Sequence, residues 1–251
     1  MPAIELFILI ILFFATTVVG VVTGSNSLIT VPVMFQFGID EKVAVATNMF
    51  GLTFMAVGAT IPFLRQRKIN VGKISPMIVL TIVGSAIGAT LVGLITNQGI
   101  KLIVSIAMIA VTLFTVFRKT PKEGESHPVS TFSLAIAYVL TFLLAIYGGL
   151  YSGGYVTILT AMVVAFFGMT FSEAVASTKL INVFSSLVAT SVFAWHGLID
   201  YKLGLILGVT MFAGAYLGAH YATRMNEVWL KRIFLATVFF LALKILYDLL
   251  A

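Results

Sequence analysis

The sequence contains no cysteine, and only 10% of its 251 residues are charged. The absence of cysteine excludes disulfides and thiolate metal sites. An ordinary soluble domain has roughly 25% charged residues, and no soluble fold of this length could hide a chain that is 60% hydrophobic. The composition therefore predicts an integral membrane protein.

Motifs that carry enzyme chemistry are also missing. The sequence has no His and Glu cluster at metal-ligand spacing, no pair of carboxylates inside an apolar segment and no phosphate-binding loop. We therefore expect no enzyme activity, no cofactor or metal site and no nucleotide-driven pump. The net charge of +6 resides mostly in short loops beside apolar segments. That pattern fits the positive-inside rule better than a nucleic-acid-binding surface.

What the sequence has instead is a series of apolar segments near the length of roughly 20 residues that crosses a hydrocarbon core. Charged or turn-rich breaks separate these segments from one another. The segments lie at 4–37, 43–64, 74–96, 100–117, 132–167, 174–195, 203–222 and 230–250. Residues 118–130 form the only long hydrophilic stretch. We expect a first membrane repeat at 1–117, a cytoplasmic linker at 118–130 and a second membrane repeat at 131–251.

The two halves match each other as internal repeats. Sliding one half along the other until Gly38 meets Gly168 also superimposes loop residues and glycines that have no reason to coincide. At this spacing, called the repeat offset below, the further matched pairs are Ala46 and Ala176, Ile69 and Ile199, Asn70 and Asp200, Gly84 and Gly214, Gly88 and Gly218, and Lys101 and Lys231. Gly24 matches Gly153 at a slightly shorter offset, which indicates a single insertion between these markers.

Loop charge predicts the orientation of the repeats, because cytoplasmic loops collect Lys and Arg. In the first repeat the loop after the second segment is strongly basic and the next loop is not, whereas the second repeat shows the reverse. In the first repeat the basic loop has Arg65, Arg67, Lys68 and Lys73, and the next loop has only Lys101. In the second repeat the loop equivalent to the basic one has only Lys202, and the next loop has Arg224, Lys231 and Arg232. Equivalent loops therefore face opposite sides, as in an inverted-topology repeat.

An inverted pair requires an odd number of crossings in each repeat, although each repeat has four apolar segments. The first segments, 4–37 and 132–167, are too long for one span and too short for two. Glycine and polar residues interrupt the first of them at 23–27 and the second at 147–149 and 152–154. We expect an all-α integral membrane protein of two inverted repeats, each a broken, re-entrant hairpin followed by three transmembrane helices.

In this order and spacing, the motifs resemble the sulfite exporter TauE/SafE family of bacterial and archaeal membrane proteins over nearly the whole chain. In the first half they are the break at Gly24, the run to Pro32 and Gly38, residues 44–48 and the loop ending at Ile69. In the second half they are Gly153, Gly154, Gly168, 174–178, Asn182 and 197–200. The resemblance implies a secondary transporter for sulfite, organosulfonates or related small anions. The first break departs from the family pattern, because Ser25 and Asn26 follow Gly24 where the family tends to have consecutive glycines.

A break at membrane depth must be buried in protein or line a wet cavity, because backbone in lipid has to satisfy its own hydrogen bonds. Helices that restart there present free N–H groups and a partial positive charge of roughly +0.5, which favours an anion. We predict one shared anion site from Thr23, Gly24, Ser25, Asn26, Ser27, Ser152, Gly153 and Gly154. The alternative is small-residue packing between helices. That packing role is the one we expect for Gly84, Gly88, Gly214 and Gly218.

A second polar cluster begins the next segment of each repeat, and the repeat symmetry places it beside the breaks. Its residues are Thr47, Asn48, Ser177, Thr178, Lys179 and Asn182. Lys179 is the only basic residue well inside an apolar segment, so it could neutralise a bound anion. Equally, it could snorkel to the interface or pair with Glu173.

Together these features lead us to expect a multi-pass secondary transporter that exports a small anion, such as sulfite or an organosulfonate, across the cytoplasmic membrane. A potential negative inside drives anions outward by about 2.3 kcal/mol per charge per 100 mV. The alternatives are a passive anion channel, a permease for another small anionic metabolite, and a membrane-embedded enzyme or assembly factor. The expected partners are the anion and the lipid bilayer, with no nucleic acid, and the sequence leaves the oligomeric state open.

Overall fold

The computed structural model describes residues 3–24, 26–104, 106, 131–226, 228–230 and 232. Within these ranges every regular element is a helix, which confirms the predicted all-α class. Ser25, the linker 118–130 and most of the segments 100–117 and 230–250 lie outside the described residues.

The described helices follow the same order in both halves. In the first half they are α1 (Ala3–Thr23), α2 (Ser27–Gln36), α3 (Glu41–Arg65) and α4 (Val71–Leu94). In the second half they are α6 (Thr131–Leu150), α7 (Tyr155–Phe167), α8 (Phe171–Trp195) and α9 (Tyr201–Ala222). Among the described residues, α1, α3, α4, α8 and α9 are long and apolar enough to cross a membrane. The multi-pass membrane prediction is therefore confirmed, and α2 and α7, with 10 and 13 residues, are too short to cross.

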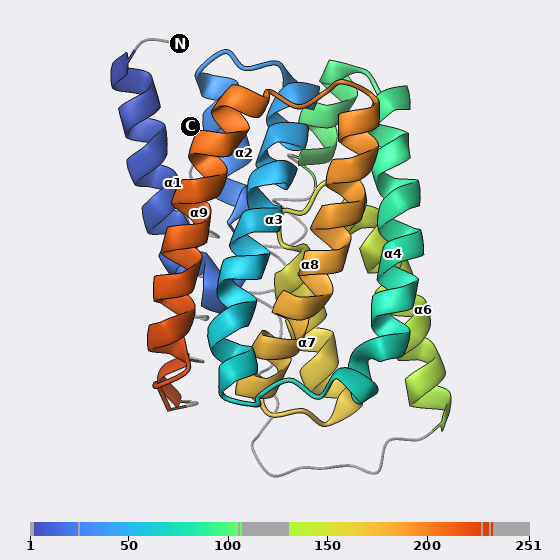
Figure 1. Cartoon of the computed structure of the whole chain (residues 1–251). Coiled ribbons are helices and arrows are strands. Elements are labelled where there is room, and N and C mark those ends of the chain that lie inside the picture. Colours follow the sequence, from blue (N-terminus) through green and yellow to red (C-terminus); the bar gives the residue numbers. More distant parts are fainter. Residues whose placement is uncertain are drawn as a thin grey trace.

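Each short helix returns the chain to the end from which it came (Figure 1). Helix α1 begins at the upper end of the bundle, and the loop 37–40 after α2 lies at that end again. Helix α6 begins at the lower end, where the loop 168–170 after α7 also lies. Helices α3 and α8 run in opposite directions, as do α4 and α9. The inverted repeat stays a prediction, because the last predicted span of each half lies mostly outside the described residues.

Helices α3 and α8 form the interior pair of the bundle. Helix α3 packs on α8 and α9, and α8 packs on α3 and α4. Helix α1 lies against α9, and α6 lies against α4. Both outer contacts depend on glycine: a Cβ at Gly88 would lie 1.9 Å from the carbonyl oxygen of Ile146, and one at Gly218 would lie 2.4 Å from that of Val18. These glycines therefore let helix backbones touch, which is a common way for membrane helices to pack.

We expect Gly88→Ala to lower the stability of the protein, because α4 and α6 must separate to admit the methyl group. Overpacking of this kind costs about 1–3 kcal/mol, and thermal unfolding in detergent should occur roughly 2–10 °C lower. The matched control is Gly93→Ala on the same helix, where a Cβ would come no closer than 3.7 Å to the side chain of His196. Equal unfolding temperatures for the two variants would contradict this packing.

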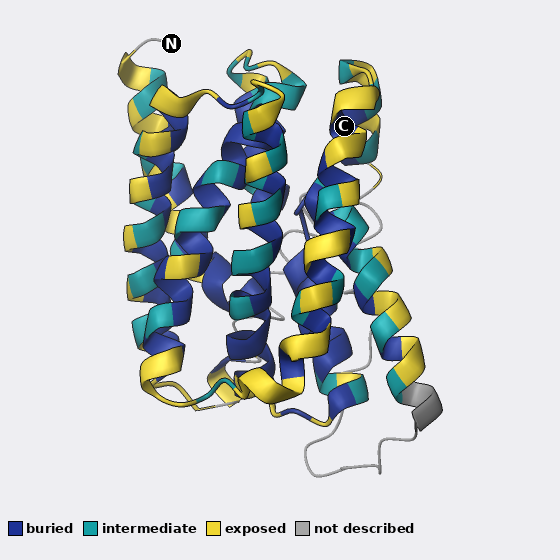
Figure 2. Ribbon diagram, turned by 45° about the vertical axis from the view of Figure 1, so that its right-hand side comes forward, coloured by how far each residue is buried: buried dark blue, intermediate teal, exposed yellow. Residues whose placement is uncertain are grey.

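Exposed residues lie along the outward sides of the helices (Figure 2), and many of them are large and apolar, whereas the interior combines a hydrophobic core with buried polar side chains. Side chains that are each at least half exposed include Phe7, Val79, Leu143, Leu187 and Val209. A soluble monomer rarely exposes apolar surface of this extent, so these side chains are suited to contact lipid. Buried Ser, Thr and Asn side chains lie on α2, α3, α7 and α8, and they lead to the candidate site.

Candidate functional site

The two breaks contact each other in the interior of the bundle. The hydroxyl oxygens of Ser27 and Ser152 are 3.1 Å apart. The Thr157 hydroxyl donates to the carbonyl oxygen of Thr23 at 2.7 Å, and the Tyr151 hydroxyl donates to that of Ser27 at 2.9 Å. Two segments that lie in different halves of the sequence are thereby joined directly.

Glycine at the first break is required both by backbone conformation and by space. Gly24 has φ +72°, and a Cβ there would lie 2.8 Å from the backbone nitrogen of Thr157 and from Cβ of Val156. Gly154 has φ +77°, so the left-handed residues of the two breaks are separated by the full repeat offset. In backbone conformation Gly24 therefore corresponds to Gly154, and not to Gly153, with which the shorter offset had aligned it. The other left-handed residues of the described chain pair in the same way, as Gly38 with Gly168 and Arg67 with Gly197.

A chain of hydrogen bonds links the break crossing to α3. The Asn48 amide nitrogen donates to the Ser27 hydroxyl at 2.9 Å, and Thr30 donates to the Asn48 amide oxygen at 2.8 Å. In the second half, the hydroxyl oxygens of Thr160 and Thr178 are 3.1 Å apart. The repeat offset relates Thr30 to Thr160 and Asn48 to Thr178, so the two contacts are equivalent. These polar groups largely satisfy one another, so they hold the hairpins in place.

Among the residues that the structure describes, no side chain caps the helices that restart inside the bundle. At the ends of the bundle, Asp40, Asn70, Thr170 and Asp200 accept hydrogen bonds from the first backbone N–H groups of α3, α4, α8 and α9. Helices α2 and α7, which begin after Asn26 and Gly154, have no such bond. The orphan N–H groups of a helix start need an acceptor, and an anion can supply one.

Lys179 is buried in the same region, with only 2% of its surface exposed. Its ammonium group donates to the carbonyl oxygen of Gly20 at 3.3 Å, in the last turn of α1 before the break. Glu173 instead accepts from the backbone N–H of Thr170 within the capping box of α8, and among the described residues no carboxylate forms an ion pair with Lys179. Neither snorkelling nor pairing with Glu173 fits this position.

Two asparagines near the breaks are buried with unpaired polar atoms. Within the described part of the chain, both amide atoms of Asn26 lack a hydrogen-bond partner, as does the amide oxygen of Asn182. Asn26 precedes α2, and its Cβ would lie 3.1 Å from a Cβ added to Gly20, whose carbonyl receives the Lys179 bond. An unpaired buried amide is unfavourable by about 1–3 kcal/mol, so a ligand that binds here has polar groups to satisfy.

The structure separates two predicted residues from this group. The Thr47 hydroxyl accepts from the backbone N–H of Asp200 at 3.0 Å and thus ties α3 to the start of α9. The Ser177 hydroxyl contacts the sulfur of Met169 at 3.7 Å. Gly153 stays at the crossing, where its carbonyl oxygen accepts from the Tyr147 hydroxyl. Ser25 lies outside the described residues.

Four residues of the crossing were not predicted from the sequence. They are Thr30, Tyr151, Thr157 and Thr160. Thr30 and Thr160 match each other at the repeat offset, so the repeat carried a signal for them. Tyr151 had no such signal, because an aromatic residue in an apolar segment ordinarily indicates packing.

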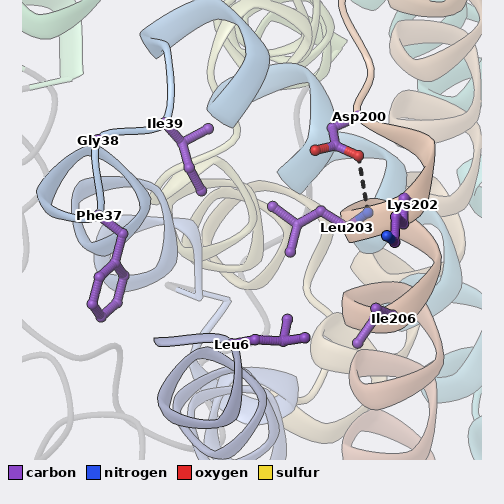
Figure 3. A pocket seen from close by; sticks show the side chains of 8 residues that line it. All are labelled: Leu6, Phe37, Gly38, Ile39, Asp200, Lys202, Leu203 and Ile206. Atoms are coloured by element: carbon purple, nitrogen blue, oxygen red, sulfur yellow. Dashed lines mark hydrogen bonds between the residues drawn. The ribbon is translucent and has the colours of Figure 1, made fainter. Parts of the chain in front are cut away.

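A cavity of about 480 Å³ lies apart from the break crossing, at the end of the bundle where α9 begins (Figure 3). Its wall includes Leu6 of α1, Phe37 and Gly38 after α2, and Asp200 and Lys202 at the start of α9. None of the predicted site residues lines it. The cavity therefore lies between the first hairpin and α9 and is separate from the crossing.

A comparison with protein families gives evidence that is independent of this geometry. Residues 8–245 match the family described as sulfite exporter TauE/SafE. The chain belongs to the sulfite exporter TauE/SafE family. This match spans both breaks and Lys179, and it confirms the resemblance seen in the sequence. Membership in the TauE/SafE family also indicates that the protein is a membrane transporter.

Named relatives of this TauE/SafE protein are described only as transporters. "Probable membrane transporter protein ORF9" of Sinorhizobium sp is 27% identical over 244 residues, which are 96% of this chain and 93% of the relative. "Probable membrane transporter protein" of Haemophilus influenzae is 26% identical, over 94% of this chain and 92% of the relative. "Probable membrane transporter protein YfcA" of Escherichia coli K12 is 25% identical, over 95% and 89%. No solved structure matches the chain.

Proposed function

We propose that this protein is a secondary transporter that exports a small anion, such as sulfite or an organosulfonate, across the cytoplasmic membrane. The observation that carries the proposal is the buried ammonium group of Lys179, which has a neutral carbonyl as its partner beside the uncapped start of α2. An isolated buried charge is strongly unfavourable. A bound anion compensates it and also accepts from the free N–H groups of α2.

The binding position consists of Lys179, the start of α2 and the amide of Asn26. Lys179 supplies charge, α2 supplies backbone donors and the partial positive charge of its N-terminus, and Asn26 supplies a side-chain donor. The network of Ser27, Asn48 and Ser152 keeps the hairpins crossed around this position. The crossing is packed tightly at Gly24, which favours a transporter that changes conformation over a permanently open pore.

The basic loops assign the two sides of the membrane. Arg65, Arg67 and Lys68 lie in or beside the loop at the lower end of the bundle in Figure 1, and Arg224 follows α9 at the same end. The positive-inside rule makes this end cytoplasmic. The cavity at Lys202 then faces outward, and a membrane potential negative inside favours export of an anion.

Flux from proteoliposomes tests the proposal. Purified protein should release preloaded anions from a panel of sulfite, sulfate, sulfoacetate and small carboxylates, without nucleotide and faster when the lumen is negative. Saturable flux indicates a transporter, whereas unsaturable and much faster flux indicates a channel. No flux of any of these anions above that of protein-free liposomes would refute the proposal.

Single cysteines test the orientation, because the native chain has none to interfere. Gln66 and His196 are both exposed, in loops at opposite ends of the bundle. We expect an impermeant thiol reagent to label His196→Cys in intact cells and to label Gln66→Cys only after the cells are permeabilised. Labelling of both variants from outside would contradict the proposed inverted topology.

A further inference from the structure

A buried hydroxyl cluster lies at the middle of α4 and α8 and joins the two halves of the protein. The hydroxyl oxygens of Ser85 and Ser185 are 2.7 Å apart, and Ser85 also reaches the carbonyl oxygen of Ala145 on α6 at 3.3 Å. The hydroxyl of Tyr155, the first residue of α7, faces Thr81 and Ser185. All four of these hydroxyl side chains are at most 1% exposed.

Two hydroxyls of this cluster lack a hydrogen bond of normal geometry to any described residue. They belong to Tyr155 and Thr81. Other helical threonines, such as Thr60, Thr90 and Thr141, donate to the carbonyl four residues earlier, so Thr81 forgoes a bond that its helix offers. Burying hydroxyls without well-formed hydrogen bonds costs about 1–3 kcal/mol each, and a ligand that accepts from them would recover part of that cost.

Packing alone does not require these hydroxyls. At the repeat offset, Ser185 corresponds to Met55, Thr81 to Met211 and Ser85 to Ala215. Met55 lies near Gly20 of α1, and Met211 lies against Gly51 of α3. At these equivalent positions on α3 and α9 the side chains are thus apolar.

We propose that Tyr155 and Thr81, supported by the Ser85 and Ser185 pair, form a second binding position for the oxyanion group of the transported anion. This inference rests on the proposed function. The two free hydroxyls donate to the anion, and the serine pair bonded to Ala145 fixes the wall of the position. The position is neutral, so it holds the anion more weakly than Lys179 does, and a multi-site path needs sites from which the anion can leave.

Helix α8 contributes side chains to both positions. Lys179, Asn182 and Ser185 are spaced by three residues, so each is turned about 60° from the one before and the three follow a band that winds part of the way around the helix. At 1.5 Å per residue, Lys179 and Ser185 are about 9 Å apart along the axis, which is longer than a sulfite or a small sulfonate. Asn182 lies between them with a buried, unpaired amide oxygen. The anion therefore moves along α8 between two positions and does not bridge both.

The test removes the free hydroxyls without changing the volume of the side chains. Tyr155→Phe and Thr81→Val are compared with Tyr138→Phe and Thr90→Val, which change the same residue types on α6 and on the outer face of α4. Sulfite efflux from proteoliposomes, kept free of oxygen, should fall at least tenfold in the first pair and remain normal in the second. Sulfite affinity measured by calorimetry should stay within twofold of wild type, because Lys179 is intact.

Three outcomes overturn this inference while the proposed function stands. They are normal efflux in both Tyr155→Phe and Thr81→Val, a loss of sulfite affinity equal to the loss of efflux, and a loss of efflux that follows a lower unfolding temperature. The first outcome would show that the hydroxyls are not needed for transport. The second would show that they belong to the Lys179 position and not to a separate one. The third would show that they serve stability and not binding. Absence of anion efflux from the wild-type protein would instead remove the proposed function and this inference with it.

Discussion

Replacing Lys179 by glutamine is expected to weaken anion binding about ten- to a hundredfold. Glutamine keeps much of the length and hydrogen-bonding capacity of lysine but removes the charge. A hydrogen bond to a charged group contributes roughly 1.5–3 kcal/mol, which corresponds to that change in affinity. Calorimetric titration of the purified variant with the anion that the wild type transports measures the effect.

Stability separates this explanation from a structural one. Removing a buried, uncompensated charge should leave the unfolding temperature of Lys179→Gln unchanged or raise it. The control is Lys73→Gln, since Lys73 is exposed in the first turn of α4, and its anion affinity should equal that of wild type. Anion affinity of Lys179→Gln within twofold of wild type would remove Lys179 from the site.

Substituting alanine for Gly24 is expected to abolish transport. The added methyl group would lie 2.8 Å from the backbone of Thr157 and from Val156, so the two breaks must move apart. The start of α2 would then shift away from Lys179. Anion efflux from proteoliposomes should fall to the level of protein-free liposomes, while the protein still inserts into the membrane.

Gly168→Ala is the matched control for Gly24→Ala. Gly168 has φ +59°, and a Cβ there would meet nothing within 4 Å. Both variants carry the cost of about 1–2 kcal/mol for alanine in a left-handed conformation, but only Gly24→Ala disturbs the crossing. If the two variants transport equally well, close contact between the breaks is not needed for function.

The position of the breaks could be predicted from the sequence because lipid leaves few options for interrupted helices. Helix α1 ends at Thr23 and α2 begins at Ser27, whereas α6 ends at Leu150 and α7 begins at Tyr155. Both predicted interruptions therefore occur, but the expectation that residues 147–149 form part of the second break was wrong, because they continue α6. The packing role expected for Gly84, Gly88, Gly214 and Gly218 also fits the close contacts of α4 with α6 and of α9 with α1, although the sequence did not indicate which helices meet. In each case the residue type indicates the structural role, because glycine and serine are suited to interrupted helices and to close contacts between helices.

The direction of individual side chains could not be predicted in the same way. Adjacent residues of a helix point about 100° apart, so Thr47 turns toward α9 while Asn48 turns toward the crossing. Two equal roles for Lys179 were open at the level of sequence, and only its burial beside Gly20 distinguishes them. The hydroxyl cluster was missed because its four residues come from three helices.

The position of a bound heavy-atom anion decides whether Lys179 and the start of α2 form the site. Crystals of the purified protein soaked in selenate, a mimic of sulfate, locate the anion by anomalous scattering from selenium. We expect an anomalous peak within hydrogen-bond distance of the Lys179 ammonium group and next to Asn26 at the start of α2. Selenate found only at the surface, for example in the cavity beside Lys202, with none inside the bundle, would contradict the proposed site.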